Sequence, residues 1–348
     1  MEGMSRSLYA TTVFCVAVLI ASMASAQSDT RSKGDPCAAP DVRTDVRPGA
    51  GGPPTEVSVG IRMIDLTEIN DVSQTLTGDF AVRITWTDPR LAHLEGCEIS
   101  LDDIWSPGLA LINSGRVFPS RPREAGIGPG GSVTYLQRYY GTLATYHNLR
   151  DFPFDRQRFR ISLSSLEWGE KEVQLIVDEK VTGRREPLNI SDWTIKGVKG
   201  VIDRDYADTY DRFHSRYDFE ITANRIRAYY VWKMILPLCL IVAMSWTVFW
   251  INPAQFGPQI GLSATSMLTL VAFIFATTNM LPKLGYFTTL DQFMAVSTIL
   301  VFLALVQSLT TTYLFSKEKE AIAVHIDQVS RWAFPLAFAA LVIIVLVR

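Results

Sequence analysis

Six positions between Gly261 and Asn279 are spaced so that an α-helix places them on one face. They step by four, three, four, three and four residues, which is a helical period. The six residues are Gly261, Thr265, Leu268, Ala272, Phe275 and Asn279. If several copies turned this face inward, the small and hydroxyl side chains could pass ions, and Leu268 could close the passage by dewetting. The alternative is a buried helix that uses small residues for close packing.

A second group of residues could bind a small ligand. Segment 202–213 interleaves carboxylates with aromatic rings, and its candidates are Asp203, Asp205, Tyr206, Tyr210 and Phe213. Aromatic faces attract ammonium groups, and carboxylates suit amines or Ca²⁺. The alternative is a solvated hairpin whose charges keep it soluble. We expect no resident cofactor; Ca²⁺ modulation is a hypothesis, and the metal set is unknown.

The elements that must position these residues divide the chain into two parts. The 348 residues are 48% hydrophobic, with a formal net charge of −2. No Asp, Glu, Lys, Arg or His occurs between Met234 and Pro282, whereas most charges precede Lys233. We therefore expect one part in water and one in lipid. No basic run indicates a nucleic-acid partner.

Four apolar segments have the length of a bilayer crossing, at 229–250, 259–281, 287–315 and 329–347. Together they define a transmembrane domain, 229–348. Residues 1–26 read as a signal peptide, because Arg6 precedes an apolar run and Ala24-Ser25-Ala26 fits a cleavage site. The alternative is a retained anchor. Export of the N-terminus would leave both the N-terminal domain and the C-terminus extracytoplasmic.

Between the signal peptide and the spans, the sequence predicts a loose leader and one β domain. Residues 27–55 are rich in Gly, Pro, Asp and Ser and lack apolar periodicity. Residues 56–228 show short alternating runs broken by turn residues, which favours an antiparallel β-sandwich. Gly126 to Gly131 is expected to be a loop. Cys37 and Cys97 could form one disulfide or remain two thiols.

This organisation resembles the pentameric ligand-gated ion channels of the Cys-loop receptor superfamily, in their bacterial branch. The most specific element is Phe152-Pro153-Phe154-Asp155 followed by Gln157, which resembles the centre of the family's signature loop. The flanking cysteines of animal members are absent. The resemblance covers residue 57 to the end. It implies a cyclic homopentamer in the bacterial inner membrane that conducts inorganic ions and responds to a small molecule, a proton or a divalent cation.

The resemblance also assigns a role in coupling the two domains. Asp155 and Arg225 would meet where the sandwich joins the bundle, and a desolvated carboxylate–guanidinium pair is strong and geometrically demanding. The alternative is a surface ion pair of little energy. The coupling residues implied are Asp71, Val72, Phe152, Pro153, Asp155, Arg225, Pro282 and Lys283.

Ligand binding is expected between neighbouring sandwiches. The resemblance adds Trp105, Asn113, Glu167 and Trp168 to the binding candidates. Ile112 and Leu166 stand where animal members have aromatic residues, and Ala81 replaces the opposing tryptophan, so an aromatic cage for amines is not expected. His93, His147 and His214 are possible proton sensors or ordinary packed histidines.

The sequence alone does not decide the charge of the permeant ion or the class of function. Asn252 to Gln259 carries no charge, and Pro258 with Gly261, Thr265 and Leu268 resembles the anion-selective pattern, yet cation and anion selectivity are not separated. A sensor or adhesion module on a passive four-helix anchor is the alternative function. An enzyme is not expected, because the chain lacks Gly-x-Ser-x-Gly and His-Glu-x-x-His motifs.

Overall fold

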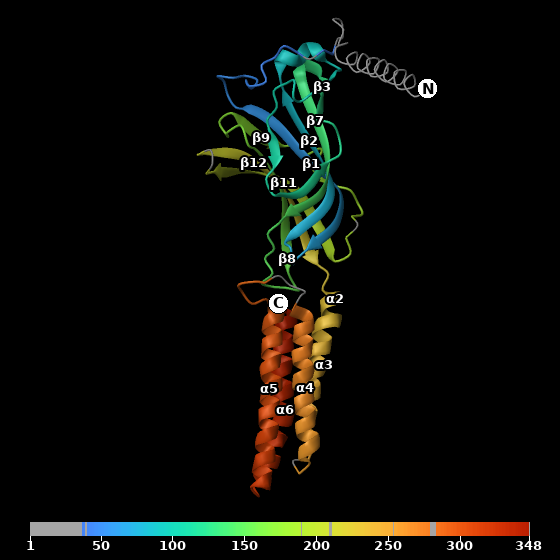
Figure 1. The fold of residues 1–348 in the computed structure, drawn as a ribbon, viewed down its shortest axis with the longest axis vertical. Coiled ribbons are helices and arrows are strands. Elements are labelled where there is room, and N and C mark those ends of the chain that lie inside the picture. Colours follow the sequence, from blue (N-terminus) through green and yellow to red (C-terminus); the bar gives the residue numbers. More distant parts are fainter. Residues whose placement is uncertain are drawn as a thin grey trace, which may run out of the picture. The chain divides into compact units, whose positions relative to one another are not determined.

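The computed structural model describes residues 37–347, apart from Ala39, Asn189, 209–210, Pro253 and 279–282. The predicted signal peptide and the first part of the leader lie outside the described residues. The chain divides into two compact units. The first contains 37–50, Trp86–Ser106 and Arg123–Tyr135, and the second contains the remaining described residues. Figure 1 labels the elements of both.

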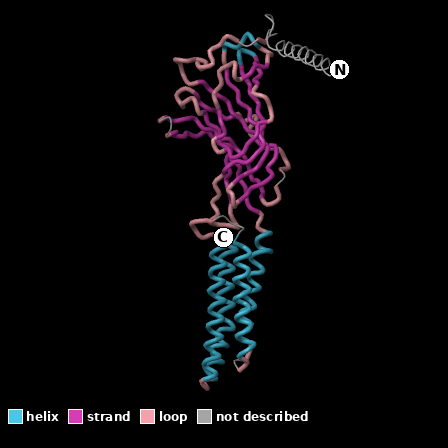
Figure 2. Tube along the Cα trace, viewed as in Figure 1, coloured by secondary structure: helices cyan, strands magenta, loops and turns pink. Residues whose placement is uncertain are grey.

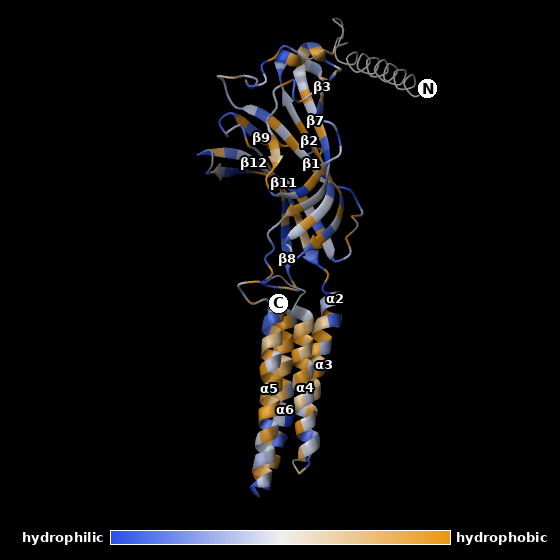
Figure 3. Cartoon of the chain, in the orientation of Figure 1, coloured by the Kyte–Doolittle hydropathy of each residue, from blue (hydrophilic) through white to orange (hydrophobic). Residues whose placement is uncertain are grey.

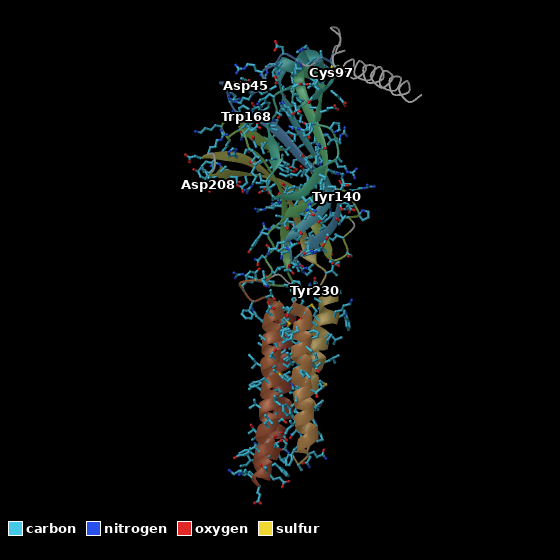
Figure 4. The ribbon with its side chains drawn as sticks, in the orientation of Figure 1. Asp45, Cys97, Tyr140, Trp168, Asp208 and Tyr230 are labelled. Atoms are coloured by element: carbon cyan, nitrogen blue, oxygen red, sulfur yellow. A yellow bond between two sulfur atoms is a disulfide. The ribbon has the colours of Figure 1, made fainter. Side chains whose placement is uncertain are left out.

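The first unit is a small strand and turn assembly closed by a disulfide. Its elements are η1 (Pro89–Leu94), β3 (Glu98–Ser100), β6 (Glu124–Gly128), η2 (Pro129–Gly131) and the start of β7 (Ser132–Ala144). β6 pairs antiparallel with β3 and with β7. Cys37 is bonded to Cys97, with Cα atoms 5.5 Å apart, so the structure contains the bridge considered from the sequence. Figure 4 labels Cys97.

Two sequence expectations fail in this unit. The predicted loop from Gly126 to Gly131 is partly strand, because Gly126 and Gly128 lie in β6 and only Pro129–Gly131 forms the turn into β7. Gly131 has a φ of 78°, and a Cβ there would approach the Asp88 carbonyl oxygen to 2.1 Å, so this turn requires glycine. The leader is not loose throughout, because Arg47 and Pro48 are buried.

The second unit contains the strands of the predicted β-sandwich. One sheet has the order β10-β1-β2-β7, with β9 added to β1 and β5 to β7, and the other has the order β11-β12-β8-β4. Figure 2 shows these strands in magenta. The bounds are β1 Thr55–Asn70, β2 Thr75–Thr87, β4 Leu109–Leu111, β5 Ser114–Pro119, β8 Arg156–Ser165, β9 Val173–Val177, β10 Gly183–Arg184, β11 Trp193–Ala207 and β12 Arg212–Arg225.

Alternating side chains explain why these segments form two packed sheets. Along β1, Val57, Val59 and Ile61 are fully buried, and along β12 the same is true of Tyr217, Phe219 and Ile221. A spacing of two residues puts each set on one face of its strand, where burial in the core stabilises the pairing. The antiparallel β-sandwich expected from the sequence is confirmed.

Four long helical segments follow the strands. The first runs from Ala228 to Trp250 through α2 (Ala228–Tyr230), η3 (Val231–Ile235), α3 (Leu236–Trp246) and η4 (Thr247–Trp250). The η3 turn is a π-helix that ends just before Pro237, which has no N–H to donate to the preceding turn. The others are α4 (Phe256–Thr277), α5 (Thr289–Ser316) and α6 (Glu320–Val347). All four are long and apolar enough to span a membrane.

The last helix begins earlier than the sequence suggested. The predicted span was 329–347, whereas α6 starts at Glu320 and only Lys317 to Lys319 separates it from α5. In the sequence, Lys317, Lys319 and Arg331 make 316–331 resemble a connector. Asp327 is buried and Arg331 donates to the carbonyl oxygen of Phe249, so the polar groups belong to the packed helix.

The helices pack through a large apolar cluster and a smaller one around Phe249. Leu238 from α3, Leu270 from α4, Phe293 from α5 and Phe338 from α6 are buried together. Figure 3 shows the continuous hydrophobic colour along these helices and the alternation along the strands. The architecture of a β-sandwich followed by four apolar helices makes this a multi-pass membrane protein.

The disulfide in the first unit generates a stability prediction. Replacing Cys37 and Cys97 by Ser removes a cross-link between residues 60 apart, and such links stabilise by about 2–4 kcal/mol. We expect a lower unfolding temperature for the purified protein in thermal denaturation. Cys239→Ala is the matched control, because Cys239 is a free cysteine in α3. Equal unfolding temperatures for the double variant and the wild type would contradict the prediction.

Candidate functional site

Arg225, at the end of β12, holds two carboxylates from other parts of the sandwich. Its Nε donates to Asp155 Oδ1 at 2.7 Å and its Nη2 to Asp155 Oδ2 at 3.1 Å. Its Nη1 donates to Asp71 Oδ2 at 2.6 Å and its Nη2 to Asp71 Oδ1 at 3.0 Å. We name Arg225, Asp71 and Asp155 the Arg225 clamp. The planar guanidinium suits two bidentate contacts, which a lysine could not make.

The clamp is buried, so its three charges depend on each other. The side chains of Arg225, Asp155 and Asp71 are 1%, 2% and 12% exposed. The guanidinium also lies 4.1 Å from the ring centroid of Trp193 and 4.8 Å from that of Phe152. Aromatic faces stabilise a desolvated cation. Removing one member of such a group leaves a buried charge without a partner.

Neighbouring polar groups fix both carboxylates. His147 Nδ1 lies 3.0 Å from Asp71 Oδ1, and His147 Nε2 lies 2.8 Å from Thr145 Oγ1. Gln157 Nε2 donates to Asp155 Oδ2 at 2.5 Å and to the carbonyl oxygen of Asn148 at 2.6 Å. Each carboxylate therefore has a second anchor besides Arg225, which limits where the guanidinium can lie.

The electrostatics of the clamp favour its charged form. Burial by itself raises the pKa of Asp71, but hydrogen bonds from His147 and Arg225 outweigh it and hold that pKa below its usual range. Burial likewise lowers the pKa of Arg225, and the hydrogen bonds to Asp155 and Asp71 more than reverse this, so the pKa of Arg225 is raised. Both groups stay ionised over the physiological pH range.

The loop between β7 and β8 connects the clamp to the helices. The backbone N–H of Thr289 donates to the carbonyl oxygen of Arg150 at 2.9 Å, and that of Leu290 to Phe152 at 3.2 Å. The Tyr286 hydroxyl accepts from the backbone N–H of Leu149 at 3.1 Å. The first N–H groups of a helix have no partner within it, so the loop carbonyls satisfy the start of α5. Because these bonds join the loop to the start of α5, a movement of the loop would also move the segment that joins α4 to α5.

The remaining coupling candidates differ in position. Phe152 and Pro153 are buried in this loop, and the Phe152 ring meets the Tyr230 ring with centroids 4.8 Å apart. Figure 4 labels Tyr230, in α2 at the start of the first helical segment. Val72 is 53% exposed in the turn between β1 and β2. Lys283 is exposed, and Pro282 lies outside the described residues.

The candidate ligand residues in the β11–β12 hairpin are already paired within the chain. Arg216 Nη2 lies 2.8 Å from Asp203 Oδ2, and its Nη1 lies 3.2 Å from Asp205 Oδ1. The rings of Tyr206 and Phe213 have centroids 5.1 Å apart. Arg204 stands over Phe213 at 5.5 Å, so the chain's own guanidinium occupies that aromatic face. Tyr210 lies outside the described residues, and Figure 4 marks the hairpin by Asp208.

The other ligand candidates differ in how far their side chains are buried or bonded within the protein. Trp105 is fully buried in the first unit, with its ring at 6.0 Å from that of Trp86, so its ring offers no surface to a ligand. Asn113 Nδ2 donates to the carbonyl oxygens of Ala144 and Arg160, which joins the two sheets of the second unit. Glu167 is exposed, and Trp168, labelled in Figure 4, is partly exposed.

No metal cluster is present among the described residues. They contain no group of three or more His, Cys, Asp or Glu side chains placed to hold an ion. Asp203 and Asp205 are engaged by Arg216, which a cation would have to displace. Ca²⁺ modulation therefore stays a prediction.

The six-residue stripe on α4 lies on the face that the rest of the chain leaves open. Leu268 and Phe275 are 71% and 73% exposed, and Gly261, Thr265 and Ala272 are exposed as well. The opposite face buries Ser263, Ser266 and Leu270 against the other helices. Asn279 lies outside the described residues. The face predicted from the sequence is thus available to neighbouring copies or to water.

Several structural residues of the site escaped the sequence reasoning. Trp193 and Tyr286 carry no local motif, and their roles depend on distant segments. Arg216 could have been suspected, because an arginine stood opposite a hairpin arm rich in aspartate. His147 was noted as a histidine, but only the fold places it on Asp71.

Comparisons with known proteins match this arrangement along most of the chain. Residues 41–226 match the family model of the neurotransmitter-gated ion-channel ligand binding domain. Residues 234–324 match that of the neurotransmitter-gated ion-channel transmembrane region. A proton-gated ion channel of Gloeobacter violaceus is 25% identical over 291 residues, which cover 82% of this chain and 80% of that one.

Two animal relatives are similar over a comparable stretch. The gamma-aminobutyric acid receptor subunit beta-4 of Gallus gallus is 26% identical, over 79% of this chain and 58% of its own. The subunit rho-3 of Rattus norvegicus is 23% identical, over 78% and 61%. The chain therefore spans less than two thirds of the length of these receptor subunits.

The clamp generates a prediction for stability. Arg225→Gln removes the cation shared by two buried carboxylates, and breaking a buried ion pair in this way costs about 3–5 kcal/mol. We expect a clear drop in the unfolding temperature of the purified protein. Arg160→Gln is the matched control, because Arg160 is 50% exposed and its partner Glu220 also pairs with Lys199. If both variants unfold alike, the clamp is not a buried, mutually dependent group.

The direction of the Asp71 shift gives a pH prediction. A carboxyl whose pKa is lowered by folding adds stability above its unfolded pKa of about 4, and this stability is lost as pH falls through the folded pKa. Thermal unfolding measured between neutral and acid pH should show a smaller acid loss for Asp71→Asn than for the wild type. Asp208→Asn, an exposed carboxylate, should leave the pH profile unchanged. Parallel profiles for Asp71→Asn and the wild type would refute this.

Proposed function

Since the chain belongs to the neurotransmitter-gated ion-channel family, we propose that five copies close around an axis and conduct ions through a pore lined by α4. The family is one of ligand-gated, pentameric ion channels. Sandwich domains then lie outside the cytoplasm, and each chain contributes one helix to the pore. Closed cyclic symmetry gives head-to-tail contacts between neighbours.

The exposed stripe of α4 is the observation that carries this proposal. A helix in a membrane bundle gains little by leaving Gly261, Thr265 and Leu268 uncovered. The Thr265 hydroxyl donates to the carbonyl oxygen of Gly261 at 2.8 Å, which leaves its oxygen lone pairs for water or ions. Leu268 forms the apolar girdle above it. Five leucines at one level close the passage to water when the helices approach one another.

A passive anchor is supported less well. Anchoring alone does not require a helix face that stays uncovered, or a buried clamp that bonds the end of the last strand, just before the first helix, to the β1–β2 turn and the loop before β8. The clamp and the loop carbonyls on α5 give a continuous path from the strands to the α4–α5 connection. A ligand that favours one arrangement of the sandwiches can shift the pore helices along this path.

The proton is a candidate agonist with a specific structural basis. The Gloeobacter relative is described as a proton-gated ion channel. In the present chain His147 is fully buried and contacts Asp71 directly. A proton added to His147 strengthens its attraction for Asp71 and so competes with Arg225 for the same carboxylate. Amines and divalent cations at the sandwich interfaces are the alternative agonists.

Leu268→Thr tests the gate. Threonine in place of five leucines removes apolar surface from the narrowest part of the pore and makes it easier to hydrate. If this stabilises the open state by on the order of 1.5 kcal/mol over the ring, the open probability rises about tenfold. Single-channel recording in planar bilayers measures it. Leu336→Thr is the matched control, since Leu336 is 67% exposed but lies on α6. An unchanged open probability for Leu268→Thr, or an equal rise for Leu336→Thr, would argue against a gate at this position.

His147→Gln tests the proton as agonist. The glutamine keeps hydrogen-bonding capacity but does not take up a proton, so currents evoked by acidifying the extracytoplasmic side should fall. His214→Gln is the control, because His214 is also buried but bonds to the carbonyl oxygen of Trp168, away from the clamp. Undiminished acid currents in His147→Gln would exclude His147 as the sensor. The same bilayers then serve to compare amines and divalent cations.

A further inference from the structure

The interface between α5 and α6 contains a buried acid inside a membrane span. Asp327 on α6 is 1% exposed, and Gln307 Nε2 on α5 donates to its Oδ1 at 2.7 Å. Acidic residues are costly in a membrane helix and need a partner there. The clamp, the hairpin and the α4 stripe make no use of this pair.

Each of the two side chains has a second oxygen that lacks a donor. Asp327 Oδ2 and Gln307 Oε1 are buried, and neither makes a hydrogen bond of ordinary geometry among the residues that the structure describes; the Thr311 hydroxyl lies near Asp327 but donates to the carbonyl oxygens of Gln307 and Ser308. As a carboxylate and an amide oxygen, both can only accept. A buried acceptor without a donor costs about 1–3 kcal/mol, and more when it is charged, so two at one contact require an explanation.

The nearest candidate counter-ion is turned away from the acid. Arg331 follows Asp327 by four residues, a spacing that brings side chains together on a helix. Its Nε instead donates to the carbonyl oxygen of Phe249 at 2.8 Å, and the described residues show no ion pair between Arg331 and Asp327. An ionised Asp327 would attract this guanidinium strongly in such buried surroundings.

The elements packed on α6 supply no other counter-ion. In the described residues of α5 the titratable side chains are Asp291 and Tyr313, and Tyr313 is 61% exposed. The η4 turn has none, and α3 has only Cys239. His325 is exposed on α6 itself. The geometry therefore gives Asp327 an amide partner and no ion pair, since Arg331 acts on it only from beyond ion-pair distance.

We propose that Asp327 and Gln307 form a proton-binding site that fastens α6 to α5 within the membrane. A single proton taken from water turns the carboxylate into a carboxylic acid. The amide N–H then donates to Oδ1, and the acid O–H on Oδ2 donates to Gln307 Oε1. One proton satisfies both orphan oxygens in a reciprocal acid–amide pair, and no net charge remains in lipid.

This site is independent of how the channel is gated. α6 buries few of its residues in the chain, with Ala323, Asp327 and Ser330 as the buried positions of its first half. The acid–amide pair is therefore a large share of its polar attachment to α5. Protonation of this site decides how firmly α6 is held against α5.

Conservative variants of Asp327 separate this pairing from mere packing. Asn carries the donor and acceptor of the neutral acid, so Asp327→Asn should keep the unfolding temperature of the wild-type channel in lipid nanodiscs. Asp327→Leu and Gln307→Leu each remove the reciprocal pair and leave a partner unsatisfied, and we expect a loss of about 3–6 °C for each. The double variant Asp327→Leu, Gln307→Leu should regain part of this loss.

Infrared spectroscopy reads the proton directly. The wild-type spectrum at neutral pH minus that of Asp327→Asn should contain the C=O stretching band of a protonated carboxyl group. Asp291→Asn, at the capping box of α5, provides a control for removing a carboxyl from another helix position. The measurement needs no channel activity, so it can fail or succeed apart from the proposed function.

Three outcomes would overturn the proposal. The first is a difference spectrum without an acid band. The second is an Asp327→Asn variant as unstable as Asp327→Leu. The third is a wild-type unfolding temperature that is higher in Na⁺ than in a bulky organic cation, with no such difference for Asp327→Asn. That result would show that the site holds a metal cation and not a proton.

Discussion

A buried arginine shared by two carboxylates is the interaction on which the rest of the structure depends. Arg225 ends the last strand, three residues before the first helix begins at Ala228. In water its two ion pairs would contribute little, but in this desolvated position each charge needs the others. The strand pair β1–β2 reaches the clamp through Asp71, and the loop before β8 reaches it through Asp155. The clamp therefore ties three segments of the sandwich together at the end of the strand that leads into the first helix.

The loop that carries Phe152 and Asp155 contacts the helices through backbone hydrogen bonds. Carbonyl oxygens of the loop at Arg150 and Phe152 accept from the first N–H groups of α5, which no other part of that helix could satisfy. α5 follows α4 directly in the chain, so the loop cannot move without pulling on the connection between them. In the proposed pentameric channel, a shift of this connection would move the exposed stripe of α4 and so change the width of the passage between the five copies.

The sequence predicted the architecture well because its signals are periodic. Alternation along the strands and long uncharged runs along the helices report which faces are buried, and the stripe on α4 follows from the same geometry. The prediction failed where polar residues serve packing. The polar stretch 316–331 resembles a connector, because the partners of Asp327 and Arg331, namely Gln307 and the carbonyl oxygen of Phe249, lie far away in the chain. The clamp was anticipated only as an Asp155–Arg225 pair. That Asp71 also binds Arg225, and that His147 holds Asp71 in place, depends on the folded sheets.

The candidate ligand residues show a second limit of prediction from sequence. Carboxylates beside aromatic rings suggest an amine site, yet Arg216 and Arg204 occupy these groups within the chain itself. The residue types of a segment do not show whether its carboxylates and rings bind a ligand or an arginine of the same chain. Trp105 illustrates the same point, because a tryptophan in a loop can equally be the centre of a core.

One rate measurement tests most directly whether the Arg225 clamp controls the α4 passage. In a Cys239→Ala background, Leu268→Cys is exposed to a membrane-impermeant thiol reagent in a planar bilayer, and the decay of current gives the modification rate. The rate is then measured again with Asp71→Asn added. The account predicts that current decays on modification and that weakening the clamp changes the rate. A current insensitive to the reagent, or identical rates in the two backgrounds, would contradict it.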